Sequence, residues 1–279
     1  MKIAVLSGKG GTGKTFVSTN LAIAAGKAAY VDCDVEEPNG RLFLKPENIK
    51  STPIKVKTPL VNVMKCSGCR KCVDFCKFHA MAFVNNKPII FPAICHSCGG
   101  CALLCPENAI KETEREIGVV EHGIHGDTRI ITGVMNPGEE SGVPIIKEAL
   151  SEGFEASENV IIDCPPGSAC AVMESVSMSD YCVIIAEPTA FGLHNFRMVY
   201  ELSQLMGKHC CAVINKESEK YAPLEDFCSE HNIPVALRIP YSEELAALGA
   251  NAHVASEAKE EYMEMFKSLL DYISREAKK

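Results

Sequence analysis

Residues 3–15 read IAVLSGKGGTGKT, and this stretch decides the fold. The first four residues form the apolar pattern of a short buried strand, and the apolar residues after residue 15 recur at helical spacing. Between them stands a loop of the form G-x4-G-K-T. A strand, this loop and a helix in that order are typical of a P-loop, in which backbone N–H groups and the helix N-terminus bind phosphate. The stretch therefore predicts a nucleotide-binding site in an α/β domain.

The loop predicts a role for each of its residues. Lys14 is expected to contact the β- and γ-phosphates, and the Thr15 hydroxyl is expected to ligate Mg²⁺. The other residues are expected to bind the phosphates through backbone N–H groups: Gly8, Lys9, Gly10, Gly11, Thr12 and Gly13.

Two further apolar strands end in acidic residues, since residues 29–34 read AYVDCD and residues 160–167 read VIIDCPPG. An open parallel sheet binds its ligands at the carboxyl ends of its strands. Asp163 is therefore expected to act on Mg²⁺, directly or through water. Acids at strand ends often only cap the next helix. Two such ends beside a P-loop favour a functional role.

The remaining apolar segments extend the sheet. Continuous apolar strands that alternate with amphipathic segments indicate a doubly wound, mostly parallel sheet covered by helices on both faces. Residues 118–121 and 129–132 predict an antiparallel pair at an edge. Further strands are expected at 182–186, 210–214 and 235–237, and helices near 143–150, 192–206, 223–231 and 254–275.

Eight of the fifteen cysteines lie between residues 66 and 105. They form two runs of the pattern C-x2-C-x2-C-x3-C, offset by 29 residues, which indicates an internal duplication. Such runs hold [4Fe-4S] clusters in which the fourth cysteine of each run ligates the other cluster. The predicted ligand sets are Cys66, Cys69, Cys72 and Cys105 for one cluster, and Cys76, Cys95, Cys98 and Cys101 for the other.

Zinc is the alternative for these cysteines, because tetrahedral zinc sites also use C-x2-C pairs. Doubled four-cysteine runs are more specific, and they resemble bacterial two-cluster ferredoxins. Residues 82–84 and 89–91 predict two short strands around a turn, which fits a ferredoxin core. Cys170, outside the runs, is expected to be a small packed thiol.

Composition excludes several classes of function. The 279 residues carry a formal charge of −8, which disfavours nucleic-acid binding. No apolar run reaches the roughly 18 residues that span a bilayer, so no membrane insertion is expected. A cytoplasmic location is predicted.

The loop KGGTGKT at 9–15, with a lysine directly after the first glycine, resembles the deviant Walker A motif of the MinD/ParA ATPase superfamily. Together with DCDVEEPN at 32–39, the two cysteine runs, and DCPPGSAC at 163–170, the chain resembles MinD-superfamily ATPases that contain an inserted ferredoxin domain. The resemblance implies a P-loop ATPase domain over 1–59 and 113–279, interrupted by a ferredoxin-like α+β domain with two [4Fe-4S] clusters over 60–112.

The resemblance also implies roles for particular residues. Lys9 would reach across a dimer to the nucleotide of the partner, and Asp34 would position the attacking water. Residues 163–167 would sense the γ-phosphate, and Asn215 would contact the adenine. The dimer would be a homodimer or a heterodimer with a paralogue. The catalytic set is then Lys9, Lys14, Asp34 and Asp163.

These features predict an ATP-hydrolysing iron–sulfur protein that couples a nucleotide-driven dimer switch to electron transfer or metallocluster handling for a partner protein. The alternative is an iron–sulfur scaffold or carrier ATPase without a redox role. A third possibility is a positioning ATPase in which the ferredoxin unit serves for docking alone.

Overall fold

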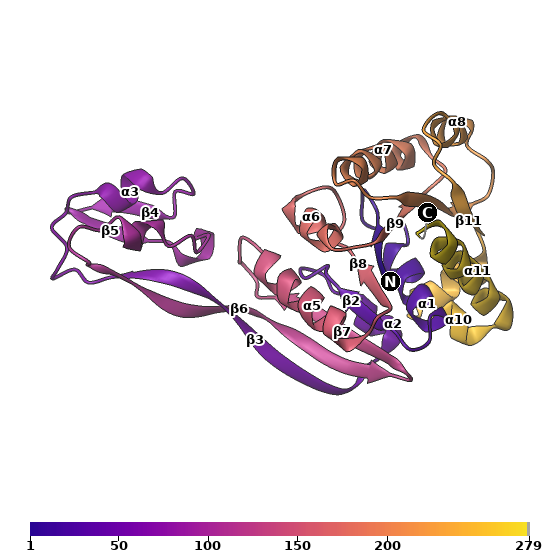
Figure 1. Ribbon diagram of the computed structural model, residues 1–279, viewed down its shortest axis with the longest axis horizontal. Helices are drawn as coiled ribbons and strands as arrows, with labels where there is room; N and C mark the ends of the chain where they lie inside the picture. Colours follow the sequence, from indigo (N-terminus) through magenta and orange to yellow (C-terminus); the bar gives the residue numbers. More distant parts are fainter. Residues whose placement is uncertain (278–279) are drawn as a thin grey trace.

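One large sheet organises the chain, as the alternation of apolar strands and amphipathic segments predicts (Figure 1). The computed structural model describes residues 1–277. Within them nine strands form this sheet in the order β11-β10-β9-β1-β8-β2-β7-β6-β3. Their bounds are β1 (Lys2–Leu6), β2 (Ala29–Asp32), β3 (Glu47–Val61), β6 (Ile110–His125), β7 (Thr128–Met135), β8 (Val160–Asp163), β9 (Tyr181–Ala186), β10 (Cys210–Glu217) and β11 (Val235–Pro240).

The seven strands from β11 to β7 are parallel, and β1 lies near their centre. On β8, Asp163 pairs in register with Val5 of β1 and with Asp32 of β2. This register brings the two predicted acidic strand ends side by side, next to the loop that follows β1.

Helices cover both faces of the parallel strands, and successive strand residues alternate between two apolar clusters. Ala4 and Leu6 pack with one cluster, while Ile3 and Val5 pack with the other. The helices of the first face are α5 (Val143–Ala156), α6 (Cys170–Ser177), α7 (Ala190–Leu205) and α8 (Ala222–Glu230). Those of the second are α1 (Lys14–Ala24), α2 (Gly40–Leu44), α9 (Glu243–Ala250), α10 (Ala255–Ala258) and α11 (Glu260–Glu276).

The predicted antiparallel pair is confirmed, since β6 runs antiparallel to β7 with Glu121 opposite Thr132, but the pair is not the edge of the sheet, because β3 lies outside β6. The sequence did not reveal how far β6 continues. It pairs with the long strand β3, and the two strands extend beyond the sheet as a ribbon (Figure 1). We call residues 55–61 and 110–116 the arm, and residues 1–54 and 117–277 the body. Leu60 lies opposite Lys111 in the arm, so the predicted domain boundaries at 60 and 112 fall across from each other.

The arm carries residues 62–109, which we call the cysteine-rich unit (Figure 1). Its elements are short: α3 (Lys71–Phe75), β4 (Met81–Val84), β5 (Lys87–Ile90), the 3-10 helix η1 (Pro92–Ile94) and α4 (Gly100–Leu103). The two strands pair antiparallel around a turn at Asn85 and Asn86, as the sequence predicts.

The C-terminal segment differs from the single amphipathic stretch expected over 254–275. The backbone is extended at Lys259, and this break separates α10 from α11. The predicted apolar face of α11 is buried: Tyr262, Phe266, Leu269 and Ile273. None of the helices within residues 1–277 combines the length and the apolar character that crossing a bilayer requires.

Candidate functional site

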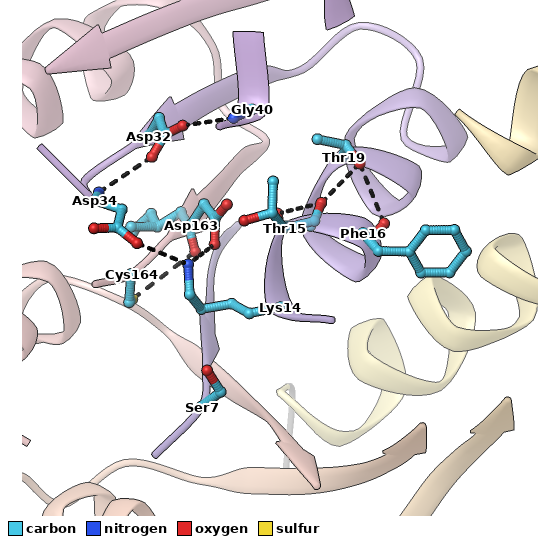
Figure 2. A network of polar contacts seen from close by, with 12 residues as sticks. Ser7, Lys14, Thr15, Phe16, Thr19, Asp32, Asp34, Gly40, Asp163 and Cys164 are labelled. Carbon is cyan, nitrogen blue, oxygen red and sulfur yellow. Dashed lines mark hydrogen bonds and ion pairs between the residues drawn. The ribbon is translucent and has the colours of Figure 1, made fainter. Parts of the chain in front are cut away.

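The loop after β1 brings Lys14 to the acidic strand ends. Gly13 precedes α1 with a φ of 94°, and a Cβ there would lie 2.1 Å from Nδ2 of Asn215, so only glycine fits. Lys14 Nζ lies 2.6 Å from Oδ1 of Asp163 and 3.8 Å from Oδ2 of Asp34. Figure 2 shows this ammonium between the two carboxylates. Three of the predicted catalytic residues are therefore in contact.

The carboxylates are held by further hydrogen bonds. Tyr30 donates its hydroxyl proton to Oδ2 of Asp163 at 2.8 Å. Asp32 accepts the backbone N–H groups of Asp34 at 3.1 Å and Gly40 at 2.9 Å. Asp32 thus fixes the segment that carries Asp34. Sequence reasoning missed the role of Tyr30, because a tyrosine in an apolar strand reads as a core residue.

Burial and charge act on the titratable groups of this site. Burial alone would lower the pKa of Lys14, but attraction to Asp163, Asp32 and Asp34 outweighs it and raises the pKa. Burial raises the pKa of Asp34 to about 6, although Lys14 opposes the shift. Burial and the neighbouring Asp163 also raise the pKa of Asp32. Lys14 stays positively charged at neutral pH and is available to bind anions.

A cavity of about 790 Å³ opens over these groups. Lys14, Thr15 and Asp34 line it together with residues of the loop and of the Asp163 strand end, among them Lys9, Gly10, Gly11, Gly13, Pro165 and Pro166. Most of the predicted phosphate-binding residues, all except Gly8 and Thr12, therefore line one space that is large enough for a nucleotide.

A second cavity of about 290 Å³ adjoins the loop from the other side. It is lined by Gly13, Phe16, Asn215, Pro240 and Tyr241, among others, and is largely apolar. Asn215 donates its side-chain amide to the carbonyl of Thr12 at 2.7 Å. This contact holds the predicted adenine-binding residue against the phosphate loop.

Lys9 pairs with an acidic residue directly after β9. Its ammonium lies 2.6 Å from Oε2 of Glu187 and 5.0 Å from the ring centroid of Phe191. The other oxygen of Glu187 pairs with Lys216 at 2.7 Å. Glu187 is thus a partner that the sequence did not reveal.

In the cysteine-rich unit, one small cavity collects the first predicted set of ligands. It is lined by the thiol-bearing residues Cys66, Cys69, Cys72 and Cys105. Burial raises the pKa of the Cys72 thiol, and the nearby Cys66 and Cys69 raise it further. Cys105 Sγ accepts the backbone N–H of Ala109 at 3.3 Å.

Residues of the second run lie next to the body. A cavity of about 310 Å³ is lined by Cys95 and His96 of the unit, Arg115 of the arm, and Glu139 and Cys170 of the body, among others. Cys170 is exposed at the start of α6, so the expectation of a packed thiol is wrong. Its side chain meets this cavity instead of the interior of the sheet.

No three histidine, cysteine, aspartate or glutamate side chains converge closely enough within residues 1–277 to hold a single metal ion. The four thiols of the first set nevertheless line one cavity.

The parallel sheet, the phosphate loop and the lysine held by strand-end acids define a P-loop nucleotide-binding protein. The sequence matches the model of the CobQ/CobB/MinD/ParA nucleotide binding domain over residues 3–254. The chain belongs to this family and is a MinD/ParA-type nucleotide-binding ATPase.

Two relatives come from Methanocaldococcus jannaschii. The uncharacterized protein MJ0578 is 30% identical over 270 residues, which cover 94% of this chain and 95% of that protein. The uncharacterized protein MJ0579 is 26% identical over 250 residues, which cover 88% of this chain and 87% of that protein.

Solved structures share the fold. The septum site-determining protein MinD of Pyrococcus horikoshii, complexed with Mg-ADP, has a TM-score of 0.61 at 18% identity, covering 99% of this chain and 96% of that one. The cell division ATPase MinD of Pyrococcus furiosus has a TM-score of 0.60 at 17% identity, covering 98% of each chain. At these identities the likeness shows the MinD-like fold alone.

Proposed function

We propose that this chain is an ATP-hydrolysing iron–sulfur protein in which a nucleotide-driven dimer switch controls electron transfer, or the handling of a metallocluster, for a partner protein. The observation that carries the proposal is the cavity lined by Cys66, Cys69, Cys72 and Cys105, on a unit that a ribbon joins to the nucleotide-binding body. These four residues are the set that the crossed ligation of a two-cluster ferredoxin requires.

Cysteine thiolates are the ligands that [4Fe-4S] clusters take, and the two runs offer two sets of four. Cys66, Cys69, Cys72 and Cys105 would hold one, and Cys76, Cys95, Cys98 and Cys101 would hold the other. Clusters with four thiolate ligands supply one-electron transfer at a potential that nearby hydrogen bonds tune. The backbone N–H of Ala109 on Cys105 Sγ is one such hydrogen bond. The cysteine-rich unit, with the ends of the arm, would then be the inserted ferredoxin-like domain.

The body residues support phosphoryl transfer to water. In this structure Lys14 pairs with Asp163. The phosphates of ATP would compete for Lys14 and release Asp163, which with the Thr15 hydroxyl would face Mg²⁺. Asp34 would accept a hydrogen bond from the attacking water and orient it toward the γ-phosphate. Asn215 would contact the base in the adjoining apolar cavity.

A dimer of two such chains would complete the site. Lys9 is held by Glu187 in this structure, and its side chain is partly exposed. When two subunits face each other across ATP, Lys9 would exchange Glu187 for the phosphates of the partner's nucleotide. Because Glu187 also pairs with Lys216, it would keep a cationic partner after Lys9 departs.

A continuous set of backbone contacts joins Asp34 to the base of the arm. Val35, next to Asp34, accepts the N–H of Met135 at 2.8 Å. The next residue, Asn136, donates its N–H to the carbonyl of Ile117 at 2.9 Å. The register of β3 and β6 shifts at Ile117, between the pairs Ile54–Gly118 and Lys55–Glu116. A movement of the Asp34 segment would therefore act on the bulge from which the arm leaves the body.

Close packing around Val35 restrains these backbone contacts. Gly142 lies so near Val35 that a Cβ there would be 2.3 Å from Cγ2 of Val35. Arg115 then links arm, unit and body, since it donates to the carbonyl of Pro92 at 3.1 Å and pairs with Glu139. We infer that the Arg115 contact transmits the nucleotide state to the cysteine-rich unit.

The test is anaerobic purification followed by iron and sulfide analysis, with EPR spectra of the reduced protein in ADP and in a non-hydrolysable ATP analogue. Two clusters require about eight irons and eight sulfides per chain. We expect the spectra to differ between the two nucleotides. A colourless or zinc-loaded protein would refute the cluster assignment, and identical spectra would refute the coupling.

The scaffold or carrier alternative makes a different prediction in the same preparation. A carrier would lose iron to an apo-protein acceptor when ATP is added, whereas an electron-transfer protein would keep its iron through repeated reduction and oxidation. Iron counts after gel filtration distinguish the two.

A further inference from the structure

The cysteine-rich unit has two ends with different surroundings. The cavity of the second run is shared with Glu139 and Cys170 of the body. The cavity of the first run is lined by residues of the unit and of the adjoining arm alone, including Arg70 and Lys71. The part of the first run from Cys66 to Cys72 therefore lies at the end that is open to an outside molecule, whereas Phe78, just after the run, stacks on His96 of the cavity shared with the body.

Positive charge is concentrated around the first run. Residues 62–87 contain five basic residues and one acidic residue, Asp74, whereas residues 91–112 contain one basic and two acidic residues. Asp74 pairs with Arg70 at 2.9 Å. Lys65, Lys71 and Lys77 are exposed and form no ion pair in the part of the chain that the structure describes.

This positive charge stands out against the rest of the molecule. Residues 60–112 have six basic and three acidic residues and so a formal charge of +3, which leaves −11 for the remainder of a chain whose total is −8. A bound cluster with four thiolates adds about −2. Residues 62–87, at +4 from their side chains, stay positive with the first cluster in place.

Two exposed apolar side chains directly precede Lys65. Met64 is 91% exposed and Val63 is 54% exposed, directly before Lys65. Exposed apolar residues bordered by charge are typical of a protein-binding surface, where the apolar part contributes affinity and the charges guide the approach.

We propose that the surface formed by Val63, Met64, Lys65 and Lys71 docks an acidic one-electron carrier protein. The negatively charged body repels such a partner, and the basic end of the unit attracts it, so the field of the whole molecule guides the partner to the first run. The first cluster would then exchange electrons with the docked carrier protein, and the second cluster would face the body. This inference rests on the proposed iron–sulfur function.

The test uses the anaerobically purified full chain and an acidic plant-type [2Fe-2S] ferredoxin as the probe, with binding followed by biolayer interferometry. The variant Lys65→Glu/Lys71→Glu reverses two charges at the surface. The control Lys27→Glu/Lys220→Glu makes the same change in net charge at exposed lysines of the body. Iron content and ATPase rate verify that both variants are folded.

We expect the association rate at low ionic strength to fall at least about tenfold in the first variant and less than about twofold in the control. The difference should shrink as salt is added. Equal rates in the two variants would overturn the proposal, as would tighter binding of basic cytochrome c or comparable binding of a single-stranded oligonucleotide. The iron count of the same preparation tests the cluster assignment separately, because docking is read without electron transfer.

Discussion

In the body, apolar clusters fill both faces of the parallel sheet, whereas the cluster at the cysteine-rich unit has only three buried members within the described residues: Cys72, Met81 and Ile110. Around them, large apolar side chains such as Leu103 and Met64 are exposed. A chain segment of this size cannot offset the entropy of folding with so small a core.

Because their apolar cores differ so much in size, the two regions must depend on different sources of stability. The body positions Lys14, Asp34 and Asp163 by hydrogen bonds and packing that the polypeptide supplies itself. The unit depends on ligation of its cysteines, because bound metal contributes free energy to the folding of small domains. A substitution that abolishes ATP hydrolysis in the body should therefore leave the clusters of the unit in place, and loss of the clusters should leave the fold of the body intact.

The largest expected effect is on the body. Lys14→Ala should lower ATPase turnover by about 10²- to 10³-fold, because the transition-state charge loses its principal cation. Iron and sulfide per chain should stay unchanged. Lys27→Ala, at an exposed lysine, is the control for turnover. Undiminished turnover in Lys14→Ala would contradict the assignment of the nucleotide site.

The second effect is on the unit. Cys72→Ser/Cys101→Ser should remove both clusters and raise amide hydrogen exchange in residues 62–109 by about 100-fold or more, since local opening would approach that of an unfolded segment. Exchange in the body should stay within about threefold. Cys170→Ser, at an exposed cysteine outside the runs, is the control. Protection of the unit without iron would show that the small core suffices.

The third effect is the pH dependence of ATP hydrolysis, which Asp34 should set. Protonated Asp34 is a much weaker hydrogen-bond acceptor than the carboxylate and cannot take up a proton from the attacking water, and burial raises its pKa to about 6. The value of kcat/KM for ATP should therefore fall about tenfold for each pH unit below 6, because kcat/KM reports groups of the free enzyme. The affinity for ADP should lack this acidic limb. A flat kcat/KM profile down to pH 5 would exclude Asp34 from the reaction.

The sequence predicted the parallel sheet and the phosphate loop because both depend on local patterns: apolar strands, helical spacing and the glycines of the loop. The spacing within each cysteine run also limits which thiols can meet, and the four residues of the first set do line one cavity. The sequence did not predict the two-stranded arm. Residues 47–61 read ENIKSTPIKVKTPLV, and their many lysines, threonines and prolines conceal a long edge strand.

Contacts between segments that are distant in the chain could not be predicted from the sequence either. The hydrogen bond of Tyr30 to Asp163 and the pairing of Lys9 with Glu187 depend on strand order, which no local pattern encodes. Cys170 was misassigned for the same reason. Its surroundings include Cys95, which is 75 positions earlier in the chain and reaches α6 through the arm.

The smallest effect concerns the connection between the two regions. Arg115→Ala removes the contacts to Glu139 and to the Pro92 carbonyl, but it leaves both the nucleotide site and the cysteines intact. ATPase turnover should change less than about twofold, and the EPR difference between ADP and the ATP analogue should disappear, because the remaining link is an exposed ribbon. Lys55→Ala, which removes the exposed pair with Glu114 on the same arm, should leave that difference in place. If the difference survives in Arg115→Ala, the nucleotide state must reach the unit through the bulge at Ile117, and weakening of the Asn136 contact becomes the decisive change.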